Sequence, residues 1–224
     1  MVKQFSVLLK SWRQVCAHGV CWLCEQTVPL VDGLCTDCAM DLPYLPSHSC
    51  KPSSINGHPC RAWFAPLSYQ TPVDRWFAPF KYAHQPGMAK HFAPLIAAHV
   101  VRCYRINRIF LPQALIPIPL STMRWWQRGY NQAGLLAEEV GRLLDIPVLY
   151  PLRRRYTRAS TAMGARERAQ NLENAFRVAV PLKLERIALV DDIITSGATL
   201  GAAGRTLHQS QRCIIDAWAF AYTP

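Results

Sequence analysis

The sequence is short of acidic residues and has no long apolar segment. Aspartate and glutamate together number 14 against 25 lysines and arginines, which gives the 224 residues a formal net charge of +11. This positive field favours phosphate-bearing partners such as nucleotides, sugar phosphates or nucleic acid, without choosing among them. No window approaches the roughly 20 apolar residues of a membrane span, and the apolar run at residues 7–9 is too short for a signal-peptide core. We predict a cytoplasmic protein with no membrane span.

Two widespread phosphate-binding motifs are also missing. The P-loop pattern GxxxxGK[ST] does not occur, and no strand is followed by the GxGxxG fingerprint of dinucleotide-binding domains. The chain also shows no Ser/His/Asp or Cys/His arrangement for nucleophilic catalysis. A phosphate ligand would therefore need another kind of loop, and a reaction would depend on positioning and charge stabilisation.

The first residues have the spacing of an amphipathic helix. Apolar Phe5, Leu8, Trp12 and Cys16 recur at helical intervals, with lysine and arginine between them. We interpret this segment as a helix that packs against the rest of the chain, with a membrane-surface role as the alternative.

Cysteine is abundant, and seven of the nine cysteines lie within the first 60 residues. Without a secretory signal, CxxC pairs indicate metal binding rather than disulfides. The motifs CWLC and CTDC place Cys21, Cys24, Cys35 and Cys38 in a CxxC-x10-CxxC pattern, which suits a tetrahedral, structural Zn²⁺. The alternative is four free thiols packed as small apolar residues.

A second metal-ligand set has a less regular pattern. The motifs HSC and HPC provide His48, Cys50, His58 and Cys60, which together could form a Cys2His2 set. Their His-x-Cys spacing differs from that of a zinc knuckle, so the sequence leaves a second zinc open.

The chain divides into two unequal parts. Residues 1–60 have too little periodic apolar pattern for a hydrocarbon core, so we predict a small Cys-rich zinc-binding region. Residues 61–224 alternate strands and helices, which indicates an α/β domain with a mostly parallel sheet flanked by helices. The predicted strands are 62–70, 114–120, 186–192 and 213–223, and the predicted helices are 88–104, 131–145 and 198–210. An arginine-rich stretch at 153–171 is interpreted as a functional lid or a disordered loop.

Two adjacent carboxylates, Asp191 and Asp192, end the apolar run of the third predicted strand. Open parallel sheets bind ligands at the carboxyl ends of their strands. The residues that follow are small or hydroxylated and open a helix, so they suit a phosphate monoester. Acids beside such a loop fit a ligand that also carries hydroxyls, such as a ribose 5-phosphate. The loop comprises Thr195, Ser196, Gly197, Ala198 and Thr199.

These segments resemble those of a known family. VDDIITSGATL is similar to the 5-phosphoribosyl-1-pyrophosphate (PRPP) signature of type I phosphoribosyltransferases: an apolar run, two acids, an apolar pair, then T-x-G-x-T. IPIPLSTMRWWQRGYNQAGLLA resembles the VPVP, RGFNQ and LA segment of the ComF family, its competence-associated branch. RRRYTRAS and RERAQNLENAF resemble the T-x-x-Q, R-x-x-N and AF segment of that family. With the cysteine knuckles, the resemblance covers nearly the whole chain.

The resemblance implies a type I phosphoribosyltransferase-like fold and a role for each motif. Asp191 and Asp192 would hold the ribose hydroxyls, and the loop at 195–199 would hold the 5-phosphate. Arg128, with Arg124 as a neighbour, would approach pyrophosphate, and Mg²⁺ would bridge pyrophosphate and ribose hydroxyls. The flexible loop that closes over the reaction centre in phosphoribosyltransferases would contribute Arg158, Arg166 and Arg168.

The implied function is that of a phosphoribosyltransferase, a glycosyltransferase that acts in natural transformation, DNA uptake or the use of imported DNA. The sequence does not name its acceptor, and Ser160 stands where the family has a glutamine. The alternative is a non-catalytic PRPP-responsive or single-stranded-DNA-binding module that works with competence proteins. In that reading Trp125 and Trp126 would stack on bases, whereas the competing interpretation packs both tryptophans near the sheet edge.

Overall fold

The computed structural model describes residues 17–30, 33–48, 58–154 and 175–223. The predicted amphipathic helix at the N-terminus lies outside these residues, as does most of the arginine-rich stretch. None of the described helices combines the length and the apolarity needed to cross a bilayer.

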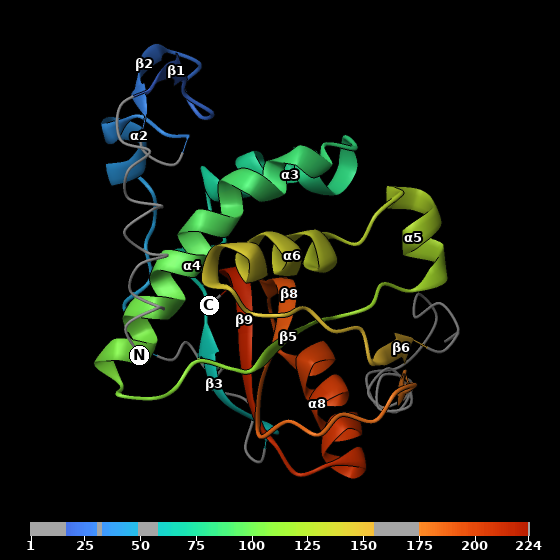
Figure 1. Cartoon of the computed structure of the whole chain (residues 1–224). Helices are drawn as coiled ribbons and strands as arrows, with labels where there is room; N and C mark the ends of the chain where they lie inside the picture. The colour runs from blue at the N-terminus through green and yellow to red at the C-terminus, as the bar shows by residue number, and fades with distance from the viewer. Residues whose placement is uncertain (1–16, 31–32, 49–57, 155–174, 224) are drawn as a thin grey trace.

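A parallel sheet forms the centre of the larger part of the chain (Figure 1). Its strand order is β3 (Cys60–Phe64), β9 (Ile214–Tyr222), β8 (Arg186–Ile194) and β5 (Ala114–Pro117), and all neighbours run parallel. Strand β4 (Leu67–Ser68) adds to the end of β9. The central strands β8 and β9 are long apolar runs because both of their faces are covered, as in other parallel sheets.

Helices cover both faces of the sheet. Helices α3 (Val73–Tyr82), α4 (Ala89–Ile106) and α6 (Gln132–Leu144) lie on one face, and α8 (Ala198–Ser210) lies on the other (Figure 1). The first face is packed with aromatic rings, including Phe77 stacked on Phe220 with ring centroids 5.0 Å apart. Helix α4 continues through Pro94, so the predicted helix is not divided there. The predicted α/β class, a parallel sheet flanked by helices, is confirmed.

The connections of the sheet reverse direction between β5 and β8. From β5 the chain passes through α6 to Val148, which bridges to Leu115 on the outer side of β5. From β8 it passes through α8 on the opposite face to β9. A crevice is therefore expected outside the carboxyl ends of β5 and β8, which is the switch point where open α/β sheets bind ligands.

The Cys-rich region forms a hairpin of β1 (Ala17–Val20) and β2 (Thr27–Leu30), followed by the short helix α2 (Thr36–Met40). Its Cys21, Leu34 and Leu42 are buried in the same hydrophobic core as α4. The ring of Trp22 lies on His91 of α4, with 3.3 Å between ring centroids. The region is thus packed against the α/β part. The predicted boundary after residue 60 stays a prediction, although Cys60 is the first residue of β3.

In the α/β part, helices α3 and α5 (Thr122–Arg128) and strands β6 (Leu152–Arg154) and β7 (Phe176–Val178) were not predicted. Helix α3 has apolar residues at helical spacing, but Pro79 lies inside it and Pro72 directly precedes it, so its pattern was not interpreted as a helix. Helix α5 is a short helix of about two turns, made of polar and aromatic residues. Strands β6 and β7 form an antiparallel pair of three residues each. The predicted strand at 62–70 is interrupted between β3 and β4, where Pro66 cannot donate a backbone hydrogen bond.

Candidate functional site

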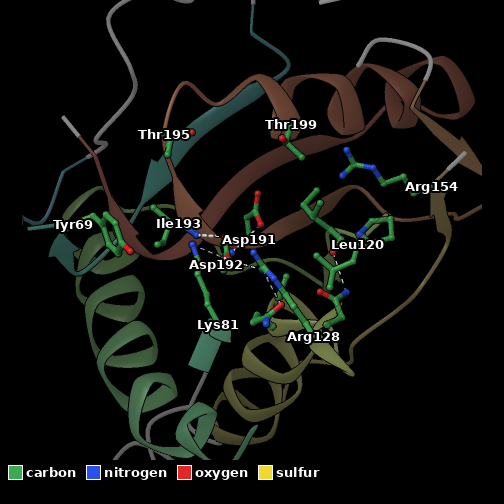
Figure 2. A pocket seen from close by; sticks show the side chains of 15 residues that line it. Tyr69, Lys81, Leu120, Arg128, Arg154, Asp191, Asp192, Ile193, Thr195 and Thr199 are labelled. Carbon is green, nitrogen blue, oxygen red and sulfur yellow. Dashed lines mark hydrogen bonds and ion pairs between the residues drawn. The ribbon is translucent and has the colours of Figure 1, made fainter. Parts of the chain in front are cut away.

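A cavity of about 310 Å³ opens at the carboxyl ends of β5 and β8 (Figure 2). Its walls combine the double aspartate, the loop that follows, and basic side chains from three other elements. The lining residues are Tyr69, Lys81, Ile118, Pro119, Leu120, Arg128, Asn131, Gln132, Ala133, Arg154, Asp191, Asp192, Ile193, Thr195 and Thr199. The cavity therefore lies at the switch point of the sheet, and both acids at the end of β8 line it.

The two carboxylates at the end of β8 have different environments. Burial and the neighbouring negative charge of Asp192 raise the pKa of Asp191 to about 7, although the Asp192 backbone N–H donates to its Oδ1 at 2.9 Å. Asp192 is ion-paired instead, with its Oδ2 3.3 Å from Lys81 Nζ and 3.8 Å from Arg128 Nη1. One acid of the pair is therefore easily protonated near neutral pH, and the other is charge-compensated.

Three cations face the acids from three elements. Lys81 comes from the last turn of α3, Arg128 from the end of α5, and Arg154 from β6. Lys81 also lies over the rings of Tyr69 and Phe77, with its Nζ 5.6 and 5.4 Å from their centroids. Sequence reasoning missed Lys81 because it lies on the unpredicted helix α3. The available signal was the helical spacing of the apolar residues Val73, Trp76, Phe77 and Phe80 just before Lys81, which Pro79 interrupts.

The RGYNQ motif links the elements around the cavity. Tyr130 Oη donates to the Phe80 carbonyl at 2.6 Å, and Gln132 Nε2 donates to the same oxygen at 3.3 Å. Asn131 Nδ2 donates to the carbonyl of Ile118 in the loop after β5, at 3.0 Å. Gln132 Oε1 accepts from Arg128 Nη1 at 3.2 Å. The motif thus holds the end of α3 next to α6, which places Lys81 beside Arg128.

The loop after β8 turns sharply into α8. Gly197 has φ +72° and occupies the N-cap position of α8, a left-handed conformation that favours glycine. Thr195 and Thr199 line the cavity. Ser196 is exposed, and its Oγ accepts from the Ala198 N–H at 3.5 Å. The N-terminus of a 13-residue helix beside the cavity provides the partial positive charge that attracts anions.

The four knuckle cysteines lie together. The Sγ atoms of Cys21, Cys24, Cys35 and Cys38 lie within 4.8 Å of one another. Backbone N–H groups point at the sulfurs: that of Cys35 donates to Cys21 Sγ at 3.3 Å, and that of Cys38 donates to Cys35 Sγ at 3.4 Å. Although burial opposes it, hydrogen bonding from the N–H groups of Cys24 and Cys35 lowers the pKa of Cys21 to about 6. This donor set and its N–H···S bonds suit a tetrahedral Zn²⁺.

The candidate ligands of a second metal, His48, Cys50, His58 and Cys60, do not form a group of three or more among the described residues. Cys50 lies outside them, and Cys60 is buried in the core on the α8 side. Both ring nitrogens of His58 have protein partners, since Nδ1 accepts from the Cys60 N–H at 3.1 Å and Nε2 lies 3.2 Å from the Gly197 carbonyl oxygen.

The remaining predicted residues divide between the surface and the undescribed segment. Trp125 and Trp126 are 50% and 77% exposed on α5, with their rings edge to face at 5.8 Å, so packing at the sheet edge is wrong. Arg158, Arg166 and Arg168 lie outside the described residues, as does Ser160. Arg124 lies in α5.

Several curated proteins match this chain over nearly its whole length, although no protein-family model does. Competence protein F of Haemophilus influenzae is 33% identical over 221 residues, covering 92% of each chain. The DNA utilization protein YhgH of Escherichia coli K12 is 26% identical over 223 residues, covering 92% of this chain and 97% of the relative. Competence protein ComFC of Streptococcus pneumoniae is 25% identical over 219 residues, covering 85% and 94%.

Among solved structures, a purine phosphoribosyltransferase from Pyrococcus horikoshii is similar with a TM-score of 0.32 and 14% identity. The match covers 58% of this chain and 70% of that chain. The full-length relative at 33% identity agrees with the family that the IPIP, RGYNQ and VDD segments indicated. The chain belongs to the competence protein F (ComF) family.

Proposed function

We propose that the protein binds PRPP and acts as a phosphoribosyltransferase in the uptake or use of DNA. The observation that carries the proposal is one cavity that combines two adjacent carboxylates, a glycine-containing hydroxyl loop at a helix N-terminus, and three cations. A ribose that bears a 5-phosphate and a pyrophosphate needs all three kinds of group. The names of the relatives, which refer to competence and DNA utilization, support the biological setting.

Each part of the cavity has a proposed partner on the ligand. Asp191 and Asp192 would accept hydrogen bonds from the ribose hydroxyls, and the loop from Thr195 to Thr199 would bind the 5-phosphate. The cations beside Asp192, Lys81 and Arg128, would contact pyrophosphate. Arg158 and Arg168 are proposed to join them from segment 155–174.

Mg²⁺ is proposed to accompany PRPP and to neutralise charge on the pyrophosphate oxygens. In the transfer reaction the bond between C1 of ribose and pyrophosphate would break and a bond to a nucleophilic acceptor would form. The protein would position the two groups and stabilise the departing charge.

The ion pair between Lys81 and Asp192 has a role in this proposal. Without a ligand, each group compensates the charge of the other across 3.3 Å. When ribose hydroxyls bind to Asp192, Lys81 would leave the ion pair and contact the pyrophosphate. The ion pair would thus compensate both charges until a ligand with hydroxyls and phosphates replaces it. The raised pKa of Asp191 means that binding of a cation there should release a proton near neutral pH.

Calorimetry with PRPP and Mg²⁺ tests the binding site. We expect the wild-type protein to bind and the Asp191→Asn/Asp192→Asn double variant to lose binding. A matched control is Glu139→Gln/Glu185→Gln, which also replaces two carboxyl groups by amides, at residues that do not line the cavity. Equal binding by the double variant and the control would refute the ribose assignment. A screen for pyrophosphate release with nitrogenous bases and other amines would identify an acceptor.

A second candidate function is binding of single-stranded DNA on α5. The exposed side chains of Trp125 and Trp126 favour it, because base–aromatic stacking contributes about 1–3 kcal/mol per base and tolerates any sequence. Fluorescence anisotropy with an oligothymidine should show affinity that falls steeply with salt. Trp125→Ala and Trp126→Ala should weaken the affinity for the oligothymidine. Phe110→Ala is the control and should leave the affinity unchanged, because Phe110 is an exposed aromatic residue outside α5. Absence of binding at low salt would exclude this function.

A further inference from the structure

His58 contacts the loop after β8 from outside the cavity. Its Nε2 lies 3.2 Å from the carbonyl oxygen of Gly197, a residue 139 positions later in the chain. Its Nδ1 accepts a hydrogen bond from the Cys60 N–H at 3.1 Å, and its ring meets the ring of Trp63 edge to face at 4.4 Å. Neither His58 nor Trp63 lines the cavity.

These contacts define the state of the imidazole. Because Nδ1 accepts the Cys60 N–H, the proton of the neutral ring lies on Nε2. That nitrogen therefore donates to the Gly197 carbonyl, which also accepts the Gly201 N–H of α8 at 2.8 Å. The carbonyl of Gly197 is thus held by two donors, one from α8 and one from the segment that leads into β3.

Helix α8 is shaped to receive this segment. A methyl group at Gly201 would lie 2.7 Å from His58 Nε2, and one at Gly204 would lie 2.7 Å from Pro59 Cγ. Both distances are shorter than real carbon contacts allow. The absence of side chains at these two positions therefore makes room for His58 and Pro59 against the first turns of α8.

The position of the Gly197 carbonyl sets the direction of the next amide. In a trans peptide the C=O and the following N–H point to opposite sides. With the carbonyl turned toward His58, the Ala198 N–H points to the other side, where it donates to Ser196 Oγ within the loop. A rotation of this peptide would turn a carbonyl oxygen, which repels phosphate, toward the side from which the loop would bind it.

We propose that His58 is a positioning residue for the phosphate-binding loop, acting through the Gly197 carbonyl. It keeps the peptide between Gly197 and Ala198 in the orientation that turns the carbonyl oxygen away from the side on which the loop would bind a phosphate monoester. This inference rests on the proposed binding of a ribose 5-phosphate group by residues 195–199. It assigns the HPC motif to the phosphate site rather than to a second metal.

Ribose 5-phosphate and magnesium pyrophosphate are the two probes that separate this role from general stability. In calorimetry, His58→Ala should weaken the affinity for ribose 5-phosphate about tenfold and change the affinity for pyrophosphate less than about twofold. The reason is that only the phosphate monoester would bind to the loop at 195–199. His58→Gln can donate from its amide nitrogen to Gly197 and should recover most of the loss. Unfolding midpoint and zinc content would verify that each variant is folded.

Gly201→Ala provides an independent test. It keeps histidine at position 58, but its methyl group takes the space that the imidazole ring occupies. Gly201→Ala should weaken the binding of ribose 5-phosphate as His58→Ala does. The control Gly87→Ala should leave this binding unchanged, because no atom lies within 4 Å of the added methyl group. Wild-type affinity in a folded His58→Ala protein, or equal weakening of both probes, would overturn the inference alone. A wild-type protein that binds neither probe would refute the proposed function as well.

Discussion

Replacing Asp191 with asparagine should stabilise the folded protein, and the gain should increase with pH. Burial and the charge of Asp192 raise the pKa of Asp191 from 3.8 to about 7. The folded state therefore binds the proton more tightly than the unfolded state does. The raised pKa leaves the free energy of unfolding unchanged below about pH 4. It lowers this free energy progressively as the pH rises toward about 7, and by the full amount above about pH 7.

The magnitude follows from the shift. Each pKa unit corresponds to about 1.4 kcal/mol, so the ionised carboxylate destabilises the fold by about 4 kcal/mol at about pH 8 and by about 2 kcal/mol at about pH 5. Asparagine cannot ionise, and its Oδ1 can still accept the Asp192 N–H that Asp191 accepts at 2.9 Å. The free energy of unfolding should therefore rise by up to these amounts. The diagnostic quantity is the increase of this gain between the two pH values, on the order of 2 kcal/mol.

Urea unfolding of both proteins at the two pH values, with zinc present throughout, measures this difference. Any pH dependence of the zinc site cancels between wild type and variant. Asp192→Asn is the matched control, because it breaks the ion pair with Lys81, which costs stability, and also removes the charge that helps to raise the pKa of Asp191. Its two effects oppose each other, so its net gain at about pH 8 should be smaller than that of Asp191→Asn. A gain for Asp191→Asn that does not grow with pH, or a loss at about pH 8, would refute the assignment of a destabilised carboxylate.

Three further predictions concern other parts of the molecule. Lys81→Ala should weaken PRPP binding at least about tenfold, with Lys81→Arg closer to wild type, and calorimetry that finds equal affinities would contradict the proposed pyrophosphate contact. Metal analysis should find about one zinc per chain. Cys24→Ser should lose this zinc and lower the thermal stability, and a wild-type protein that is folded without metal would overturn the knuckle interpretation. Gly141→Ala should destabilise by about 1–3 kcal/mol in chemical unfolding, because its methyl would lie 2.6 Å from the Ile146 carbonyl; Gly87→Ala should be near neutral.

The predicted strands and helices with strong periodicity were found close to their expected positions. Helix α8 spans the residues that the sequence indicated, 198–210, and β8 extends the predicted strand by two residues to Ile194. Helix α3 escaped prediction because its stability comes from packing of Trp76, Phe77 and Phe80 against α4 and β9, with Pro79 obscuring the local signal. Intrinsic propensity is a weak guide where tertiary contacts decide.

The sequence by itself determined the groups whose spacing is local: the cysteine knuckles, the double aspartate, and the loop from Thr195 to Thr199. Neighbours along the chain remain neighbours in the fold, so a motif of a few residues carries its own geometry. Only the tertiary structure brought Lys81 to Asp192 and His58 to Gly197, across 111 and 139 positions of the chain. Such pairs depend on the order of strands and on how helices pack across the sheet, which no local pattern encodes.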